Sequence, residues 1–285
     1  MMSWSVETYY AFTRKGAGGN PAGVCLCDTF PDDATMLAIA KRMGFSETVF
    51  ATRYAEGFRV RYFSPAAEVA FCGHATLALG KALAKKYGDG DFLLQLNHAR
   101  IDVSCTDATA TLSSPPASSR PLTQDILERY LAICHLSDNA LAASLPAGLA
   151  FAGNLHLVLP LQSRSDVDEV SYDFDAAKTQ MLTDNILTLV PLHITGNEIY
   201  MRNLFAAGDV YEDPATGAAA AAIGGYLRDN QALNYDESLN ATLHFMQGDV
   251  MGQPCSLAAL LSSEPDTPVR VSGEVAGPIS SPVLI

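Results

Sequence analysis

Two short segments place ionisable or nucleophilic side chains where a strand or a helix is expected to begin. Glu47 lies in "GFSETVF", whose apolar and β-branched residues favour a strand. A carboxylate there is either turned to solvent or held in a pocket, where it can take up and return a proton. In "FCGHATLA", Cys72, Gly73 and His74 come at a predicted helix start. His74 is a capping or packing residue or a reactive one, and Cys72 is an apolar filler or a thiolate stabilised by the helix.

A third segment, "EDPATGAAAAAIGGYL" from Glu212 to Leu227, joins a polar stretch to five consecutive alanines. An Asp or Thr at the N-cap, Pro214 at the first helical position and then alanine predict a sharp helix start. The absence of charge until Arg228 predicts a helix buried on all sides. Its first N–H groups then need partners, either an anionic ligand or loop carbonyls and water.

Glycine-rich segments elsewhere suggest a turn rather than a nucleotide site. "GGNPAGV" predicts a turn in which the Asn20 side chain caps its own backbone. Neither "GAGGNPAG" nor "TGAAAAAIGG" has the spacing of a phosphate-binding loop or of a dinucleotide-binding strand, turn and helix.

Composition limits the classes of partner. Of the 285 residues 48% are hydrophobic and 17% charged, which is typical of a well-packed globular chain. The formal net charge of −13 argues against nucleic acid and anionic membrane surfaces. The six cysteines are scattered, without the spacing of metal ligands, so we expect reduced thiols and no metal. The N-terminus lacks a secretory pattern, and prolines break the apolar stretch 141–161, so we expect a cytoplasmic protein without a spanning helix.

The hydrophobic pattern predicts the same mixture of elements in both halves of the chain. Strands are expected at 5–13, 22–27, 48–54, 58–65, 99–105, 108–114, 154–161, 186–194 and 241–250, and helices at 32–44, 72–88 and 125–136. Residues 113–125, rich in proline and serine, are predicted to be a linker with a domain boundary near residue 117.

A short internal repeat relates the two halves. Arg61-Tyr62-Phe63 precedes Ala75-Thr76 by about the interval that separates Arg202-Asn203-Leu204 from Ala215-Thr216. In each half an acidic residue, Glu68 or Glu212, and a tight turn follow before an alanine-rich helix. A duplication would give two buried helix starts that face one cleft, a favoured place for a small-molecule site.

The ordered set "GNPAGV", "SETVF", "EVAFCGHATLA" and "EDPATGAA" closely resembles the phenazine-biosynthesis PhzF-like family, whose members are relatives of diaminopimelate epimerase in fold. "GDVMGQPCSL" and "VRVSGEVAG" resemble that family's closing strands, so the resemblance spans nearly the whole chain. It implies an α+β fold of two similar domains, each a curled, mostly antiparallel, barrel-like sheet around a central helix. The implied domains are 1–116, joined by the last strand at about 275–285, and 117–274.

By motif match, the resemblance implies that Glu47 is the acid/base and that His74 and Asp213 assist it. It implies substrate-binding positions in the same motifs, and no cofactor or metal. The implied reaction is an isomerisation that moves a proton on a small carboxylate-bearing metabolite, with positive helix starts stabilising developing negative charge. A homodimer is implied as well. The expected binding residues are Asn20, Cys72, Gly73, Thr216, Gly217 and Ala218.

Departures from the family pattern keep alternatives open. Ala218 stands where the family usually has serine, and Leu204 and Asp209 stand where it more often has phenylalanine and glycine. A non-catalytic protein that binds small acids is one alternative. A racemase or epimerase that uses Cys72 is another, although Asp213-Pro214 is expected where a second cysteine would be. The motifs leave the substrate open, and they predict an anion between the two helix starts.

Overall fold

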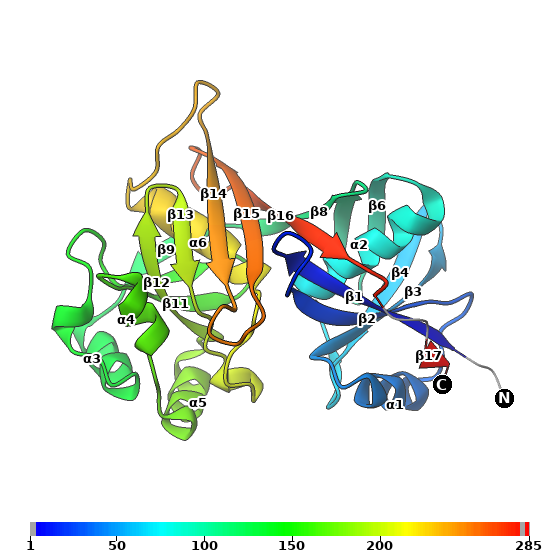
Figure 1. Cartoon of the computed structure of the whole chain (residues 1–285), viewed down its shortest axis with the longest axis horizontal. Helices are drawn as coiled ribbons and strands as arrows, with labels where there is room; N and C mark the ends of the chain where they lie inside the picture. The colour runs from blue at the N-terminus through cyan, green and yellow to red at the C-terminus, as the bar shows by residue number, and fades with distance from the viewer. Residues whose placement is uncertain (1–3, 280–282, 285) are drawn as a thin grey trace. The chain divides into compact units, whose positions relative to one another are not determined.

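The computed structural model describes residues 4–279 and 283–284 and has a mixed α+β architecture (Figure 1). The chain divides into two compact units. Unit 1 holds the described residues up to Ser113 and from Ser272 onward, and unit 2 is Ser114–Val271. The division into separately folding domains near residue 117 stays a prediction. Of the expected last strand, residues 280–282 and 285 lie outside the described residues.

Unit 1 is a mixed sheet in which antiparallel pairs predominate. β1 pairs with β2, β3 with β4, and β6 with β7 in antiparallel ladders, whereas β2 with β3 and β4 with β6 are parallel. Antiparallel pairing with β1 also binds the chain's end into this unit, through β16 and β17. The elements are β1 (Ser5–Thr13), β2 (Asn20–Leu26), α1 (Asp33–Met43), β3 (Glu47–Tyr54), β4 (Gly57–Phe63), β5 (Glu68–Val69), α2 (Gly73–Tyr87), β6 (Gly90–Gln95), β7 (Arg100–Cys105), β8 (Thr109–Pro116), β16 (Pro268–Ala276) and β17 (Val283–Leu284).

Helix α2 is buried along most of its length because strands contact it from several directions. It packs against β1, β2, β3, β6 and β7. Close packing demands small residues: a Cβ at Gly80 would lie 2.9 Å from Val103 Cγ2. Helix α1 lies against other side chains of the same strands, where Met36 and Ile39 join Phe50 and Phe63 in a buried cluster. Strand β3 therefore has a helix on each face.

Unit 2 also combines antiparallel and parallel strand pairs, and it has more helices. β9 with β10, β10 with β11, β12 with β13 and β14 with β15 are antiparallel, and β11 with β12 and β13 with β14 are parallel. The elements are β9 (Ser118–Pro121), α3 (Gln124–Ile133), the 3-10 helix η1 (Asp138–Ala140), β10 (Gly148–Phe151), β11 (Leu155–Pro160), α4 (Arg164–Glu169), α5 (Phe174–Asp184), β12 (Thr188–Thr195), β13 (Glu198–Met201), the 3-10 helix η2 (Ala206–Gly208), α6 (Gly217–Asp229), β14 (Asn240–Gln247) and β15 (Cys255–Ser262).

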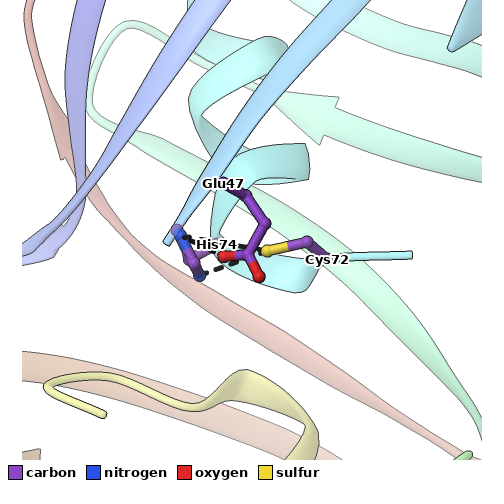
Figure 2. Close-up of side chains that lie close together, drawn as sticks. All are labelled: Glu47, Cys72 and His74. Carbon is purple, nitrogen blue, oxygen red and sulfur yellow. Dashed lines mark hydrogen bonds and ion pairs between the residues drawn. The ribbon is translucent and has the colours of Figure 1, made fainter. Parts of the chain in front are cut away.

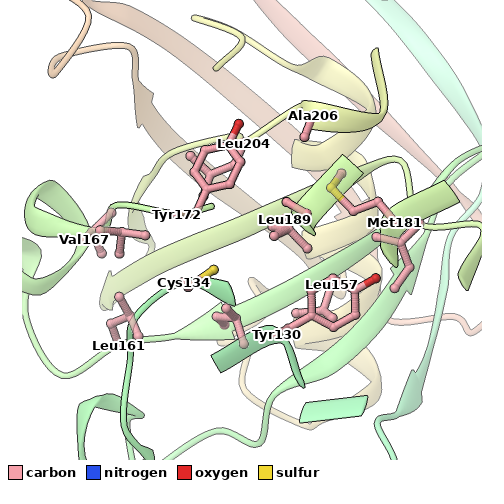
Figure 3. Packing of buried hydrophobic residues seen from close by; sticks show 14 of the residues in the cluster. Tyr130, Cys134, Leu157, Leu161, Val167, Tyr172, Met181, Leu189, Leu204 and Ala206 are labelled. Carbon is pink, nitrogen blue, oxygen red and sulfur yellow. The ribbon is translucent and has the colours of Figure 1, made fainter. Parts of the chain in front are cut away.

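The alanine-rich helix α6 is buried on all sides, as its sequence predicts. Every residue from Ala219 to Arg228 is buried, and β9, β10, β11 and β15 contact the helix. Helices α3 and α5 instead join β11 and β12 in a separate apolar cluster, in which Tyr130, Leu157, Met181 and Leu189 lie together (Figure 3). Alternation along β11 separates Leu157 and Leu159 from the intervening Val158, so both faces of the strand carry apolar side chains.

One prediction about chain organisation is wrong, and two helices were missed. The proline- and serine-rich stretch is not a linker, because β8 continues to Pro116 and β9 pairs with β10. Ala117 between them is fully buried and its N–H bonds the carbonyl of Thr267 at 3.0 Å. Helices α4 and α5 were not expected at all. Within the described residues, none of the helices has both the length and the apolar character needed to cross a membrane.

An arginine and an acid from each repeated segment form an ion pair. Arg61 bonds Glu68 with Nε and Nη2, at 2.8 and 2.6 Å, and these bonds lower the pKa of Glu68 below its ordinary range. Arg202 bonds Glu212 at 2.8 to 3.2 Å and also donates to three backbone carbonyls. The side chains of Arg202 and Glu212 are 5% and 4% exposed, against 18% and 26% for Arg61 and Glu68. Only the second pair is a fully buried one.

We expect Glu212→Gln to destabilise the chain far more than Glu68→Gln. Removing one charge from a buried pair leaves the guanidinium of Arg202 uncompensated, which costs about 3–5 kcal/mol, whereas a part-exposed pair is worth about 1 kcal/mol or less. Urea unfolding followed by circular dichroism measures both. Equal losses in the two variants would contradict the assignment of Arg202–Glu212 as the energetically dominant pair.

His156 predicts a dependence of stability on pH. It is fully buried on β11 and its Nδ1 lies 2.6 Å from Thr188 Oγ1, and burial lowers its pKa from 6.5 to about 4. Between about pH 6.5 and pH 4, His156 therefore binds a proton in the unfolded chain but stays neutral in the folded chain. Stability is complete above pH 6.5 and falls by up to about 3 kcal/mol as the pH drops toward 4. His156→Asn should flatten this slope in urea titrations, and His98→Asn, at an exposed position, should keep it; parallel slopes in wild type and His156→Asn would exclude His156 as the cause.

Candidate active site

Strand alternation places Glu47 on the side of the sheet that faces α2. Glu47 opens β3 and shares a face with the buried Val49, and α2 contacts β3. Its side chain is 19% exposed and Oε2 lies 3.4 Å from Nε2 of His74. Of the two interpretations of this strand carboxylate, the structure selects the one in which it is held against other polar groups.

The start of α2 supplies the other two reactive side chains. Cys72 is the N-cap residue and His74 the second helical residue, and both are buried. Cys72 Sγ lies 3.3 Å from His74 Nδ1, and His74 Nε2 lies 3.3 Å from Ser46 Oγ. Figure 2 shows the carboxylate of Glu47 and the thiol of Cys72 converging on the imidazole ring. The ring thus has a polar neighbour at each nitrogen.

A buried hydrogen-bonded chain holds this helix start in place. Thr76 Oγ1 donates to the carbonyl of Cys72 at 2.7 Å, and the Tyr62 hydroxyl lies 2.7 Å from the same Thr76 oxygen. Complete burial raises the pKa of the Tyr62 phenol above its ordinary value, so the hydroxyl remains a neutral hydrogen-bonding group. Tyr62 on β4 thereby fixes the backbone on which Cys72 stands.

Chemically, this arrangement can hold and move a proton. Glu47 Oε2, Cys72 Sγ and a nitrogen of His74 all lie within 4.8 Å of one another. A carboxylate, an imidazole and a thiol at such distances can act as acids or bases, and the positive end of α2 favours negative charge beside it. The same three groups are also metal ligands by type. A hollow of about 260 Å³ in unit 1 includes none of them, since it lies around Tyr54 at the other end of β3.

The start of α6 departs from the predicted helix boundary. The helix begins at Gly217 with Thr216 as N-cap, so Pro214 does not occupy the first helical position and precedes the helix by three residues. Thr216 Oγ1 donates to Asp213 Oδ2 instead of accepting from the first turn. Comparison with α2 places Thr216, Gly217 and Ala218 at the positions of Cys72, Gly73 and His74. By this comparison Thr216, rather than Asp213-Pro214, occupies the position in α6 that Cys72 occupies in α2; where a second cysteine would stand remains a prediction.

Gln247 is a structural partner of this loop that the sequence analysis missed. It is fully buried at the end of β14, where Nε2 donates to the carbonyl of Asp213 at 2.7 Å and to Thr216 Oγ1 at 3.2 Å. Its Oε1 accepts from the Thr216 N–H at 3.1 Å. One sequence signal could have pointed to this close packing, namely the glycine that follows Gln247. Gly248 has φ +80°, and a Cβ there would lie 2.9 Å from the carbonyl oxygen of Pro214.

The remaining expected residues lie at strand and helix starts. Asn20 is not a turn residue but the buried first residue of β2, after Gly18 and Gly19 with positive φ. Ala22 pairs in register with Glu47, so Asn20, two residues earlier, projects to the same face as Glu47. The structure brings together Glu47, Cys72 and His74 in unit 1, and Asp213 and Thr216 in unit 2. Ser46 is an additional neighbour of His74 that was not expected.

The fold and the site together define a class of protein. It is a mixed α+β chain in which a glutamate, a histidine and a cysteine gather at the start of a buried helix. The model of the PhzC-PhzF family, described as phenazine biosynthesis-like protein, matches residues 9–279. The chain therefore belongs to the phenazine biosynthesis-like protein family, and the resemblance predicted from its motifs is confirmed.

Relatives and solved structures extend this comparison. The chain is 28% identical to the "Uncharacterized isomerase YddE" of Escherichia coli K12 over an alignment of 273 residues. This alignment covers 92% of this chain and 91% of that protein. A PhzF-family phenazine biosynthesis protein from Bacillus anthracis superposes with a TM-score of 0.87 at 19% identity, over 100% and 99% of the two chains. A hydroxyproline epimerase from Agrobacterium vitis gives 0.65 at 8% identity, over 99% and 92%. These two structures show the shared fold.

Gln247→Leu is expected to loosen the loop before α6 while leaving the rest of unit 2 folded. The variant loses three hydrogen bonds to Asp213 and Thr216, each worth about 1 kcal/mol, so amide hydrogen exchange at residues 213–219 should accelerate about tenfold or more. Gln180→Leu, which removes a part-buried hydrogen bond to Asp184 on helix α5, is the matched control and should leave that segment unchanged. Unchanged exchange in Gln247→Leu would show that the loop is held by other contacts.

Proposed function

We propose that this chain, an isomerase by its family relatives, moves a proton within a small carboxylate-bearing metabolite with Glu47 as the group that takes and returns it. The observation that carries the proposal is the 3.4 Å contact between Glu47 Oε2 and His74 Nε2 at the start of a buried helix. A carboxylate can accept a proton from one carbon and deliver it to another, so the side chains of the chain itself suffice without an organic cofactor.

His74 and the helix start complete the proposed chemistry. Removing a proton next to a carbonyl or carboxylate leaves an enol or enolate, whose negative charge must be stabilised. The N–H groups of the first turn of α2 carry partial positive charge, and His74 can donate a hydrogen bond from the same place. Gly73 leaves this turn open, because a Cβ there would meet only Leu112 Cδ2, at 3.8 Å. We therefore assign Gly73 and Cys72 to the binding of substrate in unit 1, together with Asn20.

We assign the start of α6 to the same reaction, with Asp213 as an assisting group. The support is the loop's defined geometry: Asp213 accepts from Thr216, and Gln247 bonds both residues. Gly217 and Ala218 follow at the first turn, where backbone N–H groups suit a carboxylate. The two similar barrel-like domains, the cleft shared by their helix starts and the anion in it stay predictions.

The cellular setting is proposed from composition. A net charge of −13 favours a small metabolite over nucleic acid or an anionic membrane as partner. None of the six cysteines, all of which lie among the described residues, forms a disulfide, which supports a reducing compartment such as the cytoplasm. We also propose a homodimer, by the family resemblance.

A thiol-dependent racemase or epimerase is the second candidate, because Cys72 Sγ lies 3.3 Å from His74 Nδ1. An imidazole beside a thiol at a helix start favours a reactive thiolate. A mechanism with two opposed thiols is disfavoured, because the N-cap residue of α6 is Thr216, which has a hydroxyl where α2 has the thiol of Cys72. A non-catalytic protein that binds small acids is the third, supported by Ala218, which lacks the hydroxyl usual in the family.

Glu47→Gln is expected to abolish proton exchange. In deuterated water, mass spectrometry of a panel of small carboxylic acids should show deuterium incorporation by the wild-type chain and at least about a hundredfold less by the variant, since the amide cannot accept the proton. Glu56→Gln, at an exposed turn, is the matched control and should retain full exchange. Exchange that survives in Glu47→Gln but is lost in Cys72→Ser would overturn the role of Glu47 in favour of the thiol.

A further inference from the structure

We propose that Glu47, Cys72 and His74 form a binding site for Zn²⁺, and that zinc in this site switches the enzyme off. The three side chains come from two elements, the first residue of β3 and the start of α2, and their ligand atoms lie within 4.8 Å of one another. The spacing along the sequence gives no sign of such a site, because Glu47 is 25 residues away from Cys72. Folding alone creates it.

One pair of ligand atoms already has the separation that tetrahedral zinc requires. Bonds of about 2.0 Å to nitrogen and oxygen and about 2.3 Å to sulfur place the ligand atoms about 3.3–3.5 Å apart. Glu47 Oε2 and His74 Nε2 are 3.4 Å apart, Cys72 Sγ and His74 Nε2 are 3.8 Å apart, and all three ligand atoms lie within 4.8 Å of one another. Because Cys72 Sγ lies nearer to Nδ1, at 3.3 Å, zinc binding requires the thiol to move toward the other two ligands.

The chemistry of the ligands favours zinc over magnesium or calcium. A thiolate and an imidazole are ligands for zinc and other late transition metals, whereas the alkaline-earth ions take oxygen ligands. Cys72 and His74 are 9% and 7% exposed, so the ion would sit in a sheltered place, with a fourth position left for water or a substrate oxygen. Binding releases the thiol proton of Cys72 to solvent, and the positive end of α2 supports the resulting thiolate.

The inhibitory consequence rests on the proposed function. Zinc bound to Glu47 Oε2 occupies the carboxylate that must be free to take the substrate's proton, and it fixes His74 through the nitrogen that lies against that carboxylate. The reaction is therefore expected to stop when the site is filled and to resume when a chelator removes the ion.

Cobalt(II) tests the site without an assay of activity. The full-length chain, freed of metal with a chelator, is titrated with Co²⁺ and followed by absorption. We expect one Co²⁺ per chain, a thiolate-to-cobalt charge-transfer band and the strong visible bands of tetrahedral cobalt. Zn²⁺ should abolish all of them, because it binds such ligands more tightly than cobalt.

Variants assign the spectrum to these residues. Cys72→Ser should remove the charge-transfer band, and Cys72→Ala should do the same if the serine hydroxyl disturbs folding. Glu47→Gln should weaken Co²⁺ binding at least tenfold while keeping the band. Cys27→Ser is the matched control, since Cys27 is a partly exposed thiol of unit 1 outside the site, and it should change nothing. A charge-transfer band that persists in Cys72→Ser, or one that Cys27→Ser removes, would overturn the proposal.

The two proposals fail separately. If the cobalt spectrum appears as expected but no carboxylic acid exchanges deuterium, the metal site stands and the proposed reaction falls. If exchange depends on Glu47 but Co²⁺ gives no thiolate band, the reaction stands and the metal site falls. If both hold, exchange should fall with zinc occupancy and return with chelator; exchange that rises with zinc would overturn the inhibitory role.

Discussion

The enclosure of α2 by strands of its own unit is the constraint on which the candidate site depends. Strands on several sides leave room only for small or apolar side chains on the buried faces of the helix, and Gly80 against Val103 shows how close the contact is. Polar chemistry along such a helix would bury unpaired groups, so it is confined to the first turn. Cys72 and His74 stand at that turn, and the alternation of β3 brings Glu47 to them from the neighbouring strand.

Helix α6 obeys the same constraint with different residues. Gly225 packs so closely that a Cβ there would lie 2.7 Å from Ala117 Cβ, and the flanks of the helix are alanine. Its first turn carries Gly217 and Ala218, where α2 has Gly73 and His74. The uncharged amide of Gln247 holds the loop before α6. The two helix starts therefore differ: one presents the titratable side chains of Cys72 and His74 beside Glu47, and the other presents backbone groups together with one titratable side chain, Asp213. This difference is the physical basis for assigning proton transfer to Glu47 and anion binding to the start of α6.

The sequence predicted what local patterns and motifs determine. Helices α1, α2 and α3 and most strands follow from periodicity, and the burial of α6 follows from its uncharged run. Helix α5 was missed although Asp173 caps it, because its weakly amphipathic surface gives little periodic signal. The start of α6 was placed three residues early because Pro214 suits a first helical position, whereas Gln247, from 34 residues along the chain, holds that segment in a loop. Contacts such as those of Ser46 and Glu47 with His74 depend on how a strand end meets a helix start, which no local pattern encodes.

The N-cap residues of α2 and α6 do not make the hydrogen bond by which an N-cap side chain usually stabilises a helix. A side chain that accepts a hydrogen bond from the first turn stabilises a helix by about 1 kcal/mol. Among the described residues, neither Cys72 nor Thr216 makes this bond: the thiol lies beside His74 and the hydroxyl donates to Asp213. Three of the other α-helices among the described residues, α1, α4 and α5, are capped in the usual way by Asp32, Ser163 and Asp173, whereas Thr123 at the start of α3 makes no such bond. The missing cap is therefore not peculiar to the two buried helix starts; what distinguishes them is the neighbour that each N-cap side chain has instead. At each start the side chain of the N-cap residue makes no hydrogen bond to the first turn, which supports the proposed binding of a carboxylate there, and at α2 the sulfur lies 3.3 Å from a nitrogen of His74.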